Sequence, residues 1–323
     1  MAYPEFEVSV MSFAEEKEKE LLGKVIPQTK QPDFEEFWAN AVSEMRKVPL
    51  QIKRKKLETP YRDMVTTWEI SYNTHDDTWI DAWFSYPTAK EGQKLPCVAW
   101  FHGGSLEKGL HLDVVNTGVA CFSADVRGQG GTSIDRAVYS VGDLNGALMT
   151  RGVLDKNEFY MKHIFLDAVR EMDVIASLPE VDPERIVTYG GSQGGGLSVV
   201  ASGLSGHSKK AYVSEPSFCC IKQRIILGSR IFGSTNAFLK KYPSYTDQVF
   251  ETVSYFDVNN MVSFLEVPSM FVIGLADDVC LPHFVYSAYH HAGGDKQLFV
   301  YPFQPHTEIK DSKNMIHEEF RNL

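Results

Sequence analysis

The chain lacks the features of disulfide-stabilised, secreted and membrane-spanning proteins. Its five cysteines are an odd number scattered over 323 residues, which indicates neither a disulfide framework nor a zinc site. No segment approaches the roughly 18–20 consecutive apolar residues of a membrane helix. The acidic segment 1–20 also lacks the charged-then-apolar layout of a secretory signal. We therefore expect a cytoplasmic protein with reduced thiols and no membrane partner.

Positive charge is also scarce. The sequence has 32 Lys and Arg against 42 Asp and Glu, for a net charge of −10. Proteins that bind nucleic acid need a positive surface, so we expect no nucleic-acid partner. The one basic run, residues 46–56, is either a solvated helix end and linker or a functional patch, and its acidic flanks favour the first explanation. No histidine pair has metal-ligand spacing and no H-E-x-x-H motif occurs, so we expect neither a metal nor an organic cofactor.

What the sequence does contain is the composition of an ordinary globular protein, with 43% apolar and 23% charged residues. Its length fits one large α/β domain spanning 1–323. Residues 33–47 form an apolar stripe at helical spacing with Asp33 as a plausible N-cap. Residues 64–72 and 78–86 alternate as two antiparallel strands around a turn. We assign residues 1–60 to an N-terminal helical extension.

After residue 95, short and fully apolar strands alternate with helices. This pattern indicates a mostly parallel sheet covered by helices on both faces. The expected strands are 96–101, 119–124, 186–189, 211–214, 269–273 and 297–301, and the expected helices include 160–177 and 284–291. Residues 218–262 interrupt the alternation, and we expect them to form an inserted helical cap over the carboxyl edge of the sheet.

The most informative motif is Gly-Gly-Ser-Gln-Gly at 190–194, directly after an apolar strand and before a helix of small residues. This is the sequence form of a nucleophile elbow, a sharp strand-to-helix turn that exposes a serine. Glycine neighbours allow the strand and the helix to approach closely. The helix N-terminus favours negative charge developing near Ser192. The alternative is an ordinary serine in a tight turn.

A serine nucleophile needs a base and a carboxylate that orients the base. In the α/β-hydrolase order, the acid and then the histidine follow the nucleophile, each after a strand. Asp277 and Asp278 both follow strand 269–273, and His306 follows strand 297–301. Active sites of α/β proteins lie at this carboxyl edge. We favour Asp277 because it lies three residues after Gly274, although either aspartate could be a cap or turn residue and His306 an ordinary loop histidine.

An oxyanion formed during acyl transfer needs two preorganised donors. The backbone N–H groups of Gln193 and Gly104 are the candidates, although Gly104 could instead belong to a plain glycine turn. Gly103 and Pro216 are candidate substrate-binding residues. Arg127, after strand 119–124, is expected to hold its loop by hydrogen bonds more than to act in catalysis.

Three motifs together carry a family resemblance: Arg127–Gly130, Gly190–Gly196, and Gly274–Asp277 with Cys280 and Pro282. They resemble the acetyl xylan esterase and cephalosporin C deacetylase family, carbohydrate esterase family seven of the α/β-hydrolases. The likeness extends through residues 33–38, 151–155 and 254–257 to residues 301–302 and His306. It implies an α/β-hydrolase fold with Ser192 as nucleophile, His306 as base and Asp277 as orienting acid. It also implies deacetylation of xylo-oligosaccharides and of small esters such as cephalosporin C through an acyl-enzyme.

The same resemblance implies a cytoplasmic homo-oligomer, a hexamer of three dimers. The sequence departs from the family pattern at Gly104, where the family usually has a tyrosine, and at Thr307, where a glutamate usually follows the histidine. Two other functions remain open: a peptidase or amidase of the prolyl-oligopeptidase type, and a non-catalytic scaffold that retains the fold.

Overall fold

The computed structural model describes residues 16, 17, 19–142 and 146–323, and these residues form one nine-stranded sheet. The strand order is β1-β2-β3-β5-β4-β6-β7-β8-β9. Strands β1 to β3 are antiparallel to their neighbours, whereas β5, β4, β6, β7, β8 and β9 run parallel. The expected parallel sheet with an antiparallel extension is therefore confirmed. The strands are β1 (Ile52–Leu57), β2 (Val65–Asn73), β3 (Trp79–Pro87), β4 (Leu95–Phe101), β5 (Ala120–Ala124), β6 (Val181–Gly191), β7 (Lys210–Ser214), β8 (Ser269–Gly274) and β9 (Lys296–Tyr301).

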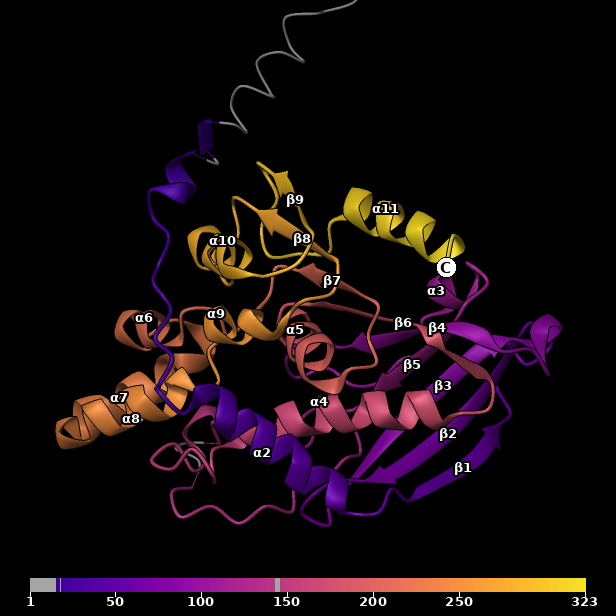
Figure 1. Cartoon of the computed structure of the whole chain (residues 1–323), viewed down its shortest axis with the longest axis horizontal. Helices are drawn as coiled ribbons and strands as arrows, with labels where there is room; N and C mark the ends of the chain where they lie inside the picture. The colour runs from indigo at the N-terminus through magenta and orange to yellow at the C-terminus, as the bar shows by residue number, and fades with distance from the viewer. Residues whose placement is uncertain (1–15, 18, 143–145) are drawn as a thin grey trace, which may run out of the picture.

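Helices cover both faces of the sheet, as expected (Figure 1). One face packs against α2 (Phe34–Lys47), α4 (Tyr160–Ser177) and α5 (Gln193–Ser205), and the other against α3 (Leu112–Val115) and α11 (Lys310–Arg321). Successive residues of a strand face opposite sides, so Val187 belongs to the second apolar cluster while Ile186 belongs to the first. Helix α10 (Pro282–His291) packs beside β8. None of the helices in the described ranges is long and apolar enough to cross a membrane.

Helix α2 begins where the sequence predicted, but Asp33 does not cap it with its side chain. The carboxylate instead pairs with Lys156 at 2.7 Å and accepts a hydrogen bond from the hydroxyl of Tyr255. The N-cap position was predicted correctly, but the side chain of Asp33 bonds Lys156 and Tyr255 instead of the helix N-terminus.

Strand β1 corrects the expected solvated linker in the helical extension 1–60. Residues 52–57 pair with β2 at the edge of the sheet. Arg54 lies 4.0 Å from the ring centroid of Trp68 and pairs with Glu180 at 2.6 Å. Charged side chains on an edge strand discourage pairing with other chains. In β1 they take the place of the apolar alternation that identifies a strand in the sequence. The first fifteen residues of the proposed extension lie outside the described residues.

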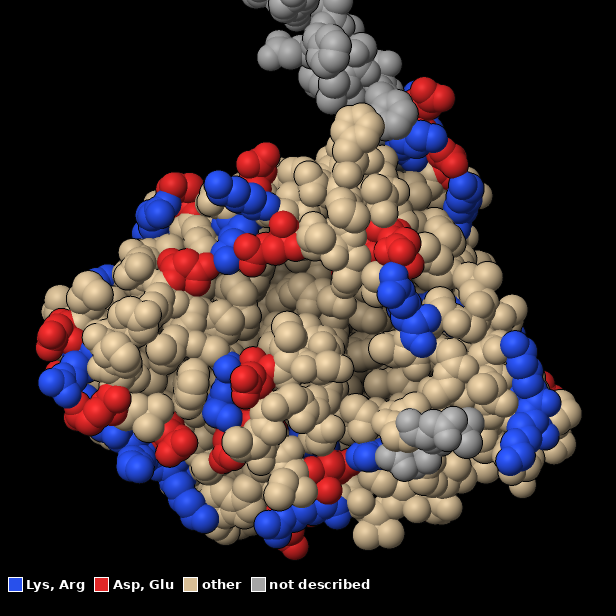
Figure 2. All heavy atoms as spheres, turned by 180° about the vertical axis from the view of Figure 1, so that it is seen from behind, with Lys and Arg blue, Asp and Glu red and all other residues tan. Residues whose placement is uncertain are grey.

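The 218–262 segment, for which we expect an inserted helical cap, consists mainly of helices. It contains α6 (Ile221–Leu227), α7 (Gly233–Lys241), α8 (Thr246–Ser254) and α9 (Val258–Met261). In Figure 1 it lies at the opposite end of the molecule from β1 to β3. The face in Figure 2 shows acidic and basic side chains intermixed around a central hollow lined mainly by other residues.

Candidate active site

Ser192 lies in a strained turn between β6 and α5. Its backbone has φ 56° and ψ −121°, a conformation that non-glycine residues rarely adopt. A Cβ at Gly190 would lie 2.3 Å from the carbonyl carbon of Gly194, and one at Gly194 would lie 2.0 Å from the Phe101 oxygen. The glycines of the motif are therefore required by the close approach of strand and helix. The strained turn presents the hydroxyl of Ser192 at the carboxyl edge of the sheet.

The structure brings the three predicted catalytic residues together. His306 Nε2 lies 3.1 Å from Ser192 Oγ, and His306 Nδ1 lies 2.8 Å from Asp277 Oδ2. These distances place a base beside the nucleophile and a carboxylate behind the base. Asp277 is buried, and its Oδ1 accepts the N–H groups of Val279 and Cys280 at 2.7 and 2.8 Å. Asp278, the competing candidate, is exposed and pairs with Arg230 at 3.0 Å.

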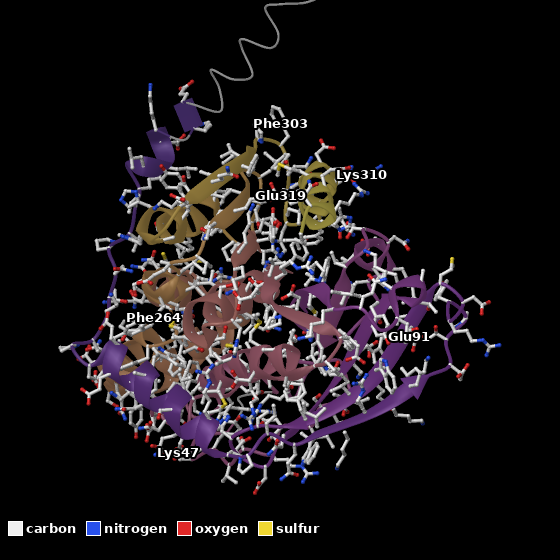
Figure 3. The ribbon with its side chains drawn as sticks, turned by 45° about the vertical axis from the view of Figure 1, so that its right-hand side comes forward. Lys47, Glu91, Phe264, Phe303, Lys310 and Glu319 are labelled. Atoms are coloured by element: carbon white, nitrogen blue, oxygen red, sulfur yellow. The ribbon has the colours of Figure 1, made fainter. Side chains whose placement is uncertain are left out.

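Two loops hold the acid and the histidine in register. The N–H groups of Leu275 and Ala276 donate to the carbonyls of Tyr301 and Gln304 at 3.0 and 3.1 Å. A Cβ at Gly274 would lie 2.5 Å from the Gln304 oxygen, so the loops could not pack this closely with a larger residue there. Phe303 of the histidine loop lies at the periphery of the molecule, with 79% exposure (Figure 3). The loops are thus fixed near the sheet while the tip remains outside.

Glu215 is a second carboxylate beside the histidine, and sequence reasoning missed it. It directly follows β7, has φ 44°, and its Oε2 lies 4.0 Å from His306 Nδ1. Burial, followed by the charge of Asp277, raises the pKa of Glu215 to about 8. The hydrogen bond that His306 donates to Asp277 is the main cause that raises the pKa of His306 above its ordinary 6.5. The sequence signal that could have identified Glu215 was its position directly after β7, the strand that neighbours β8.

The two predicted oxyanion donors face the same cavity. Gln193 begins α5, where the first N–H groups have no partner within the helix. Across the described ranges, neither its amide nor that of Gly104 is used in a backbone hydrogen bond. Gln129 joins the two segments, because its Nε2 donates to Gln193 Oε1 at 2.9 Å and its Oε1 accepts the Ser105 N–H at 2.9 Å. Both amides can therefore be held in place for a substrate oxygen.

A cavity of about 360 Å³ adjoins Ser192. This volume suits a small ester. Gly103 and Pro216 do not line it, although Gly104 and Ser217 next to them do. Its lining residues are Gly104, Ser105, Gln129, Gly146, Ala147, Leu148, Met149, Ser192, Gln193, Ser217, Arg224, Arg230, Ile231, Ser234 and Val279.

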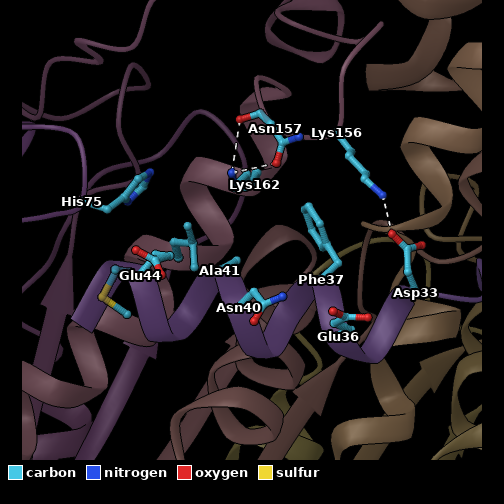
Figure 4. A pocket seen from close by; sticks show the side chains of 12 residues that line it. Asp33, Glu36, Phe37, Asn40, Ala41, Glu44, His75, Lys156, Asn157 and Lys162 are labelled. Atoms are coloured by element: carbon cyan, nitrogen blue, oxygen red, sulfur yellow. Dashed lines mark hydrogen bonds and ion pairs between the residues drawn. The ribbon is translucent and has the colours of Figure 1, made fainter. Parts of the chain in front are cut away.

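A larger hollow of about 620 Å³ lies along α2 and contains no member of the triad. Figure 4 shows Phe37, Glu44 and His75 around it, with Lys156 bonded to Asp33 at one end. Size alone therefore does not identify the active site. The nucleophile lines the smaller cavity, and its base is hydrogen-bonded to it.

Among the residues that the structure describes, two groups of side chains have metal-ligand atoms within 4.8 Å of one another: Asp277 with Cys280 and His306, and Asp76 with His75 and His163. In the first group, Asp277 and His306 are joined by the triad hydrogen bond. In the second, the guanidinium of Arg127 contacts both oxygens of Asp76, at 2.5 and 3.1 Å. Protein hydrogen bonds account for both arrangements. The contacts of Arg127 support its expected role in holding the loop.

Comparison with known proteins places these features in context. The family model described as acetyl xylan esterase (AXE1) matches residues 19–322. A solved acetyl xylan esterase from Paenibacillus sp. R4 is 32% identical, with a TM-score of 0.89 over 94% of this chain and 98% of that one. Acetyl xylan esterase 1 from Thermoanaerobacterium sp. JW/SL YS485 is 26% identical, with a TM-score of 0.86 over the same shares. The α/β-hydrolase fold expected from the sequence is confirmed.

A curated relative, the acetyl esterase Axe7A of Xylanibacter ruminicola, is 25% identical over 288 residues. The match covers 87% of this chain and 64% of that relative, so the chain spans less than two thirds of its length.

Proposed function

Because the chain belongs to the acetyl xylan esterase family, we propose that it is a serine carboxylesterase that deacetylates short acetylated sugars and similar small esters. Xylo-oligosaccharides are the leading substrate class, and cephalosporin C is a second. The observation that carries this proposal is the hydrogen-bonded series of Ser192, His306 and Asp277 beside a small cavity.

The geometry supports an acyl-enzyme mechanism. His306 Nε2 accepts the proton of Ser192 as the hydroxyl oxygen attacks the acetyl carbonyl. The amides of Gln193 and Gly104 stabilise the oxyanion. His306 then donates its proton to the departing sugar oxygen, and a water activated by the same nitrogen releases acetate. Asp277 keeps Nδ1 of His306 protonated and stabilises the imidazolium.

The family assignment does not favour a peptidase, and a non-catalytic scaffold would not require the strained serine with an intact base and acid. Comparison of an acetyl ester with a peptide amide tests the first alternative. Labelling by a fluorophosphonate tests the second, because only an activated serine reacts.

The decisive experiment replaces Ser192 with alanine and measures hydrolysis of p-nitrophenyl acetate. Hydrolysis and fluorophosphonate labelling should both be lost. Ser198→Ala is a matched control, because Ser198 is buried in the same helix and does not line the cavity. Full activity in Ser192→Ala would overturn the proposal.

Cytoplasmic location and hexamer formation are further parts of this proposal, supported by the family resemblance. Light scattering after size-exclusion chromatography measures the assembly. Hydrolysis of acetyl, butyryl and octanoyl p-nitrophenyl esters defines the acyl preference, beside acetylated xylo-oligosaccharides as the sugar substrates.

A further inference from the structure

One charged side chain in the wall of the catalytic cavity has no matching partner. Arg224 of α6 is 1% exposed and lines the same cavity as Ser192. Its Nε and Nη1 atoms are buried and make no hydrogen bond with any described residue. Arginine is almost never fully buried unless it is paired, and buried donors without acceptors are costly. The guanidinium therefore has donors without an acceptor, and a ligand can supply that acceptor.

The neighbours of Arg224 leave its charge uncompensated. No carboxylate of the described residues lies within 4.0 Å of it. Burial raises the pKa of Asp257 to about 6, and the nearby charge of Arg224 only partly opposes this shift. The oxygens of Asp257 accept the N–H groups of Cys220, Ile221 and Asn259. The thiol of Cys280 also interacts with the guanidinium, and a thiol is only a weak acceptor.

Other charged groups face this region from neighbouring elements. His306 experiences the charge of Arg224, and Asp277 and Glu215 lie 2.8 and 4.0 Å from its Nδ1. Arg230 lines the cavity too, but its side chain is half-exposed and already pairs with Asp278. Arg224 is thus the buried cation of the cavity whose acceptors are missing.

We propose that Arg224 forms a carboxylate-binding subsite, which makes acetyl esters with a carboxylate on the alcohol part preferred substrates. This inference rests on the proposed esterase function. The planar guanidinium fork matches a carboxylate, and such charge-assisted hydrogen bonds are about twice as strong as neutral ones. Because the net charge is −10, a cation inside the cavity also offsets repulsion of an anionic substrate. Acetyl esters of uronic-acid-bearing sugars have the required chemistry.

The test compares 3-acetoxybenzoate with its neutral analogue 3-acetoxybenzamide. The wild-type kcat/KM ratio should favour the anion by about tenfold or more, the usual range for a hydrogen bond to a charged group. Arg224→Gln should bring the ratio to about one, and Arg224→Lys should keep an intermediate ratio. Lys222→Gln is the charge-matched control and should preserve the wild-type preference, because Lys222 lies on the same helix, is exposed and does not line the cavity. Thermal unfolding checks that each variant is folded.

Inhibition by acetate separates the two sources of a carboxylate. If Arg224→Gln weakens acetate inhibition and leaves the substrate ratio unchanged, the subsite holds the released product. A wild-type ratio of one or less, with acetate inhibition unaffected by Arg224→Gln, overturns the inference. The test of substrate preference does not depend on the folding of a variant, because it is decided by the kcat/KM ratio that is measured for the wild-type protein.

Failure of the esterase function would be seen separately, as no hydrolysis of the neutral ester. Calorimetric binding of 3-hydroxybenzoate and 3-hydroxybenzamide then tests the subsite without catalysis. Preferential binding of the anion that is lost in Arg224→Gln supports the subsite, and equal binding contradicts it.

Discussion

Arg127 and Arg224 are both buried almost completely, with exposures of 0% and 1%, yet their surroundings are opposite. Arg127 donates to both oxygens of Asp167, at 2.6 and 2.7 Å, and also bonds Asp76 and Thr74. Arg224 has two nitrogens without partners and lines the catalytic cavity. The complete network stabilises the fold, whereas the incomplete one is available to a ligand.

The same contrast separates two regions of the carboxyl edge. Around Arg127, the loop after β5 is tied by ion pairs such as Lys108–Asp125 at 2.8 Å. Beside Ser192, the Nε and Nη1 atoms of Arg224 make no hydrogen bond with any described residue. Buried polar groups are normally satisfied, so a charged group with two unpaired donors in the wall of the catalytic cavity indicates function. Substitutions should therefore affect stability in the first region and chemistry in the second.

The largest effect is expected from Asp277→Asn. The amide can still accept the Val279 and Cys280 N–H groups, but it would favour the wrong tautomer of His306. We expect kcat to fall by a factor on the order of 10³–10⁴, with little change in the unfolding temperature. Initial rates on p-nitrophenyl acetate and thermal unfolding measure the two quantities.

Asp278→Asn is the control for that variant, and it should stay near wild type because Asp278 pairs only with the exposed Arg230. A large loss of activity in the control, with Asp277→Asn active, would assign the acid role to Asp278.

The same substitution at both arginines tests the comparison directly. Arg127→Met leaves Asp76 and Asp167 without their cation, and removing one partner of a buried pair costs about 3–5 kcal/mol of unfolding free energy. Arg224→Met leaves no ion-paired carboxylate without its partner, so the unfolding free energy of this variant should be unchanged or higher. Urea denaturation measures both. Equal destabilisation by the two variants would remove the distinction between the arginines.

Glu215→Gln should alter the pH dependence. Burial raises the pKa of Glu215 from an ordinary 4.5 to about 8, so the folded state favours the protonated acid. That contribution to stability is complete below pH 4.5 and is lost as the pH rises through about 8. Above this pH, the glutamine variant should be more stable than wild type by a few kcal/mol. Urea denaturation at pH 5 and pH 9 measures the difference.

The pH–rate profile provides a second readout for the same variant. Ionised Glu215 raises the pKa of His306, so wild type should show an inflection near pH 8 that Glu215→Gln lacks. On the acidic side of the wild-type profile, the midpoint of the decrease in rate should lie above pH 6.5, because protonated His306 cannot act as a base. Superimposable profiles and stabilities would show that Glu215 does not titrate beside the histidine.

Local patterns predicted most of the fold. Helix 160–177 has the predicted limits, because its apolar stripe is long and uninterrupted. Strand 52–57 was missed because four consecutive basic residues replace the usual alternation. The triad could be predicted because each member follows a strand in a known order. Glu215 offered a signal in its position directly after β7. Its importance beside His306, like that of Arg224 in the cavity wall, depends on neighbours that only the folded chain brings near.

Substitutions at two glycines also test the contrast between the Arg127 region and the region around Ser192. A Cβ at Gly131, in the Arg127 region, would lie 2.0 Å from Asp125 Oδ1, whereas one at Gly104 would meet only Gln193 Oε1, at 3.8 Å. Gly131→Ala should therefore cost about 1–3 kcal/mol of unfolding free energy, and Gly104→Ala should cost less than about 0.5 kcal/mol.

The open space beside Gly104 also predicts the effect of a tyrosine there, the residue that the family resemblance leads us to expect at this position. Gly104→Tyr keeps the backbone donor and adds a ring that reduces the cavity, so longer acyl chains should lose rate more than acetyl. We expect the acetyl-to-octanoyl ratio of kcat/KM to rise by about tenfold, the lower end of the effect of one methylene group in an apolar pocket. An unchanged ratio would show that octanoyl chains do not pass Gly104, and that the acyl pocket is formed by other walls of the cavity.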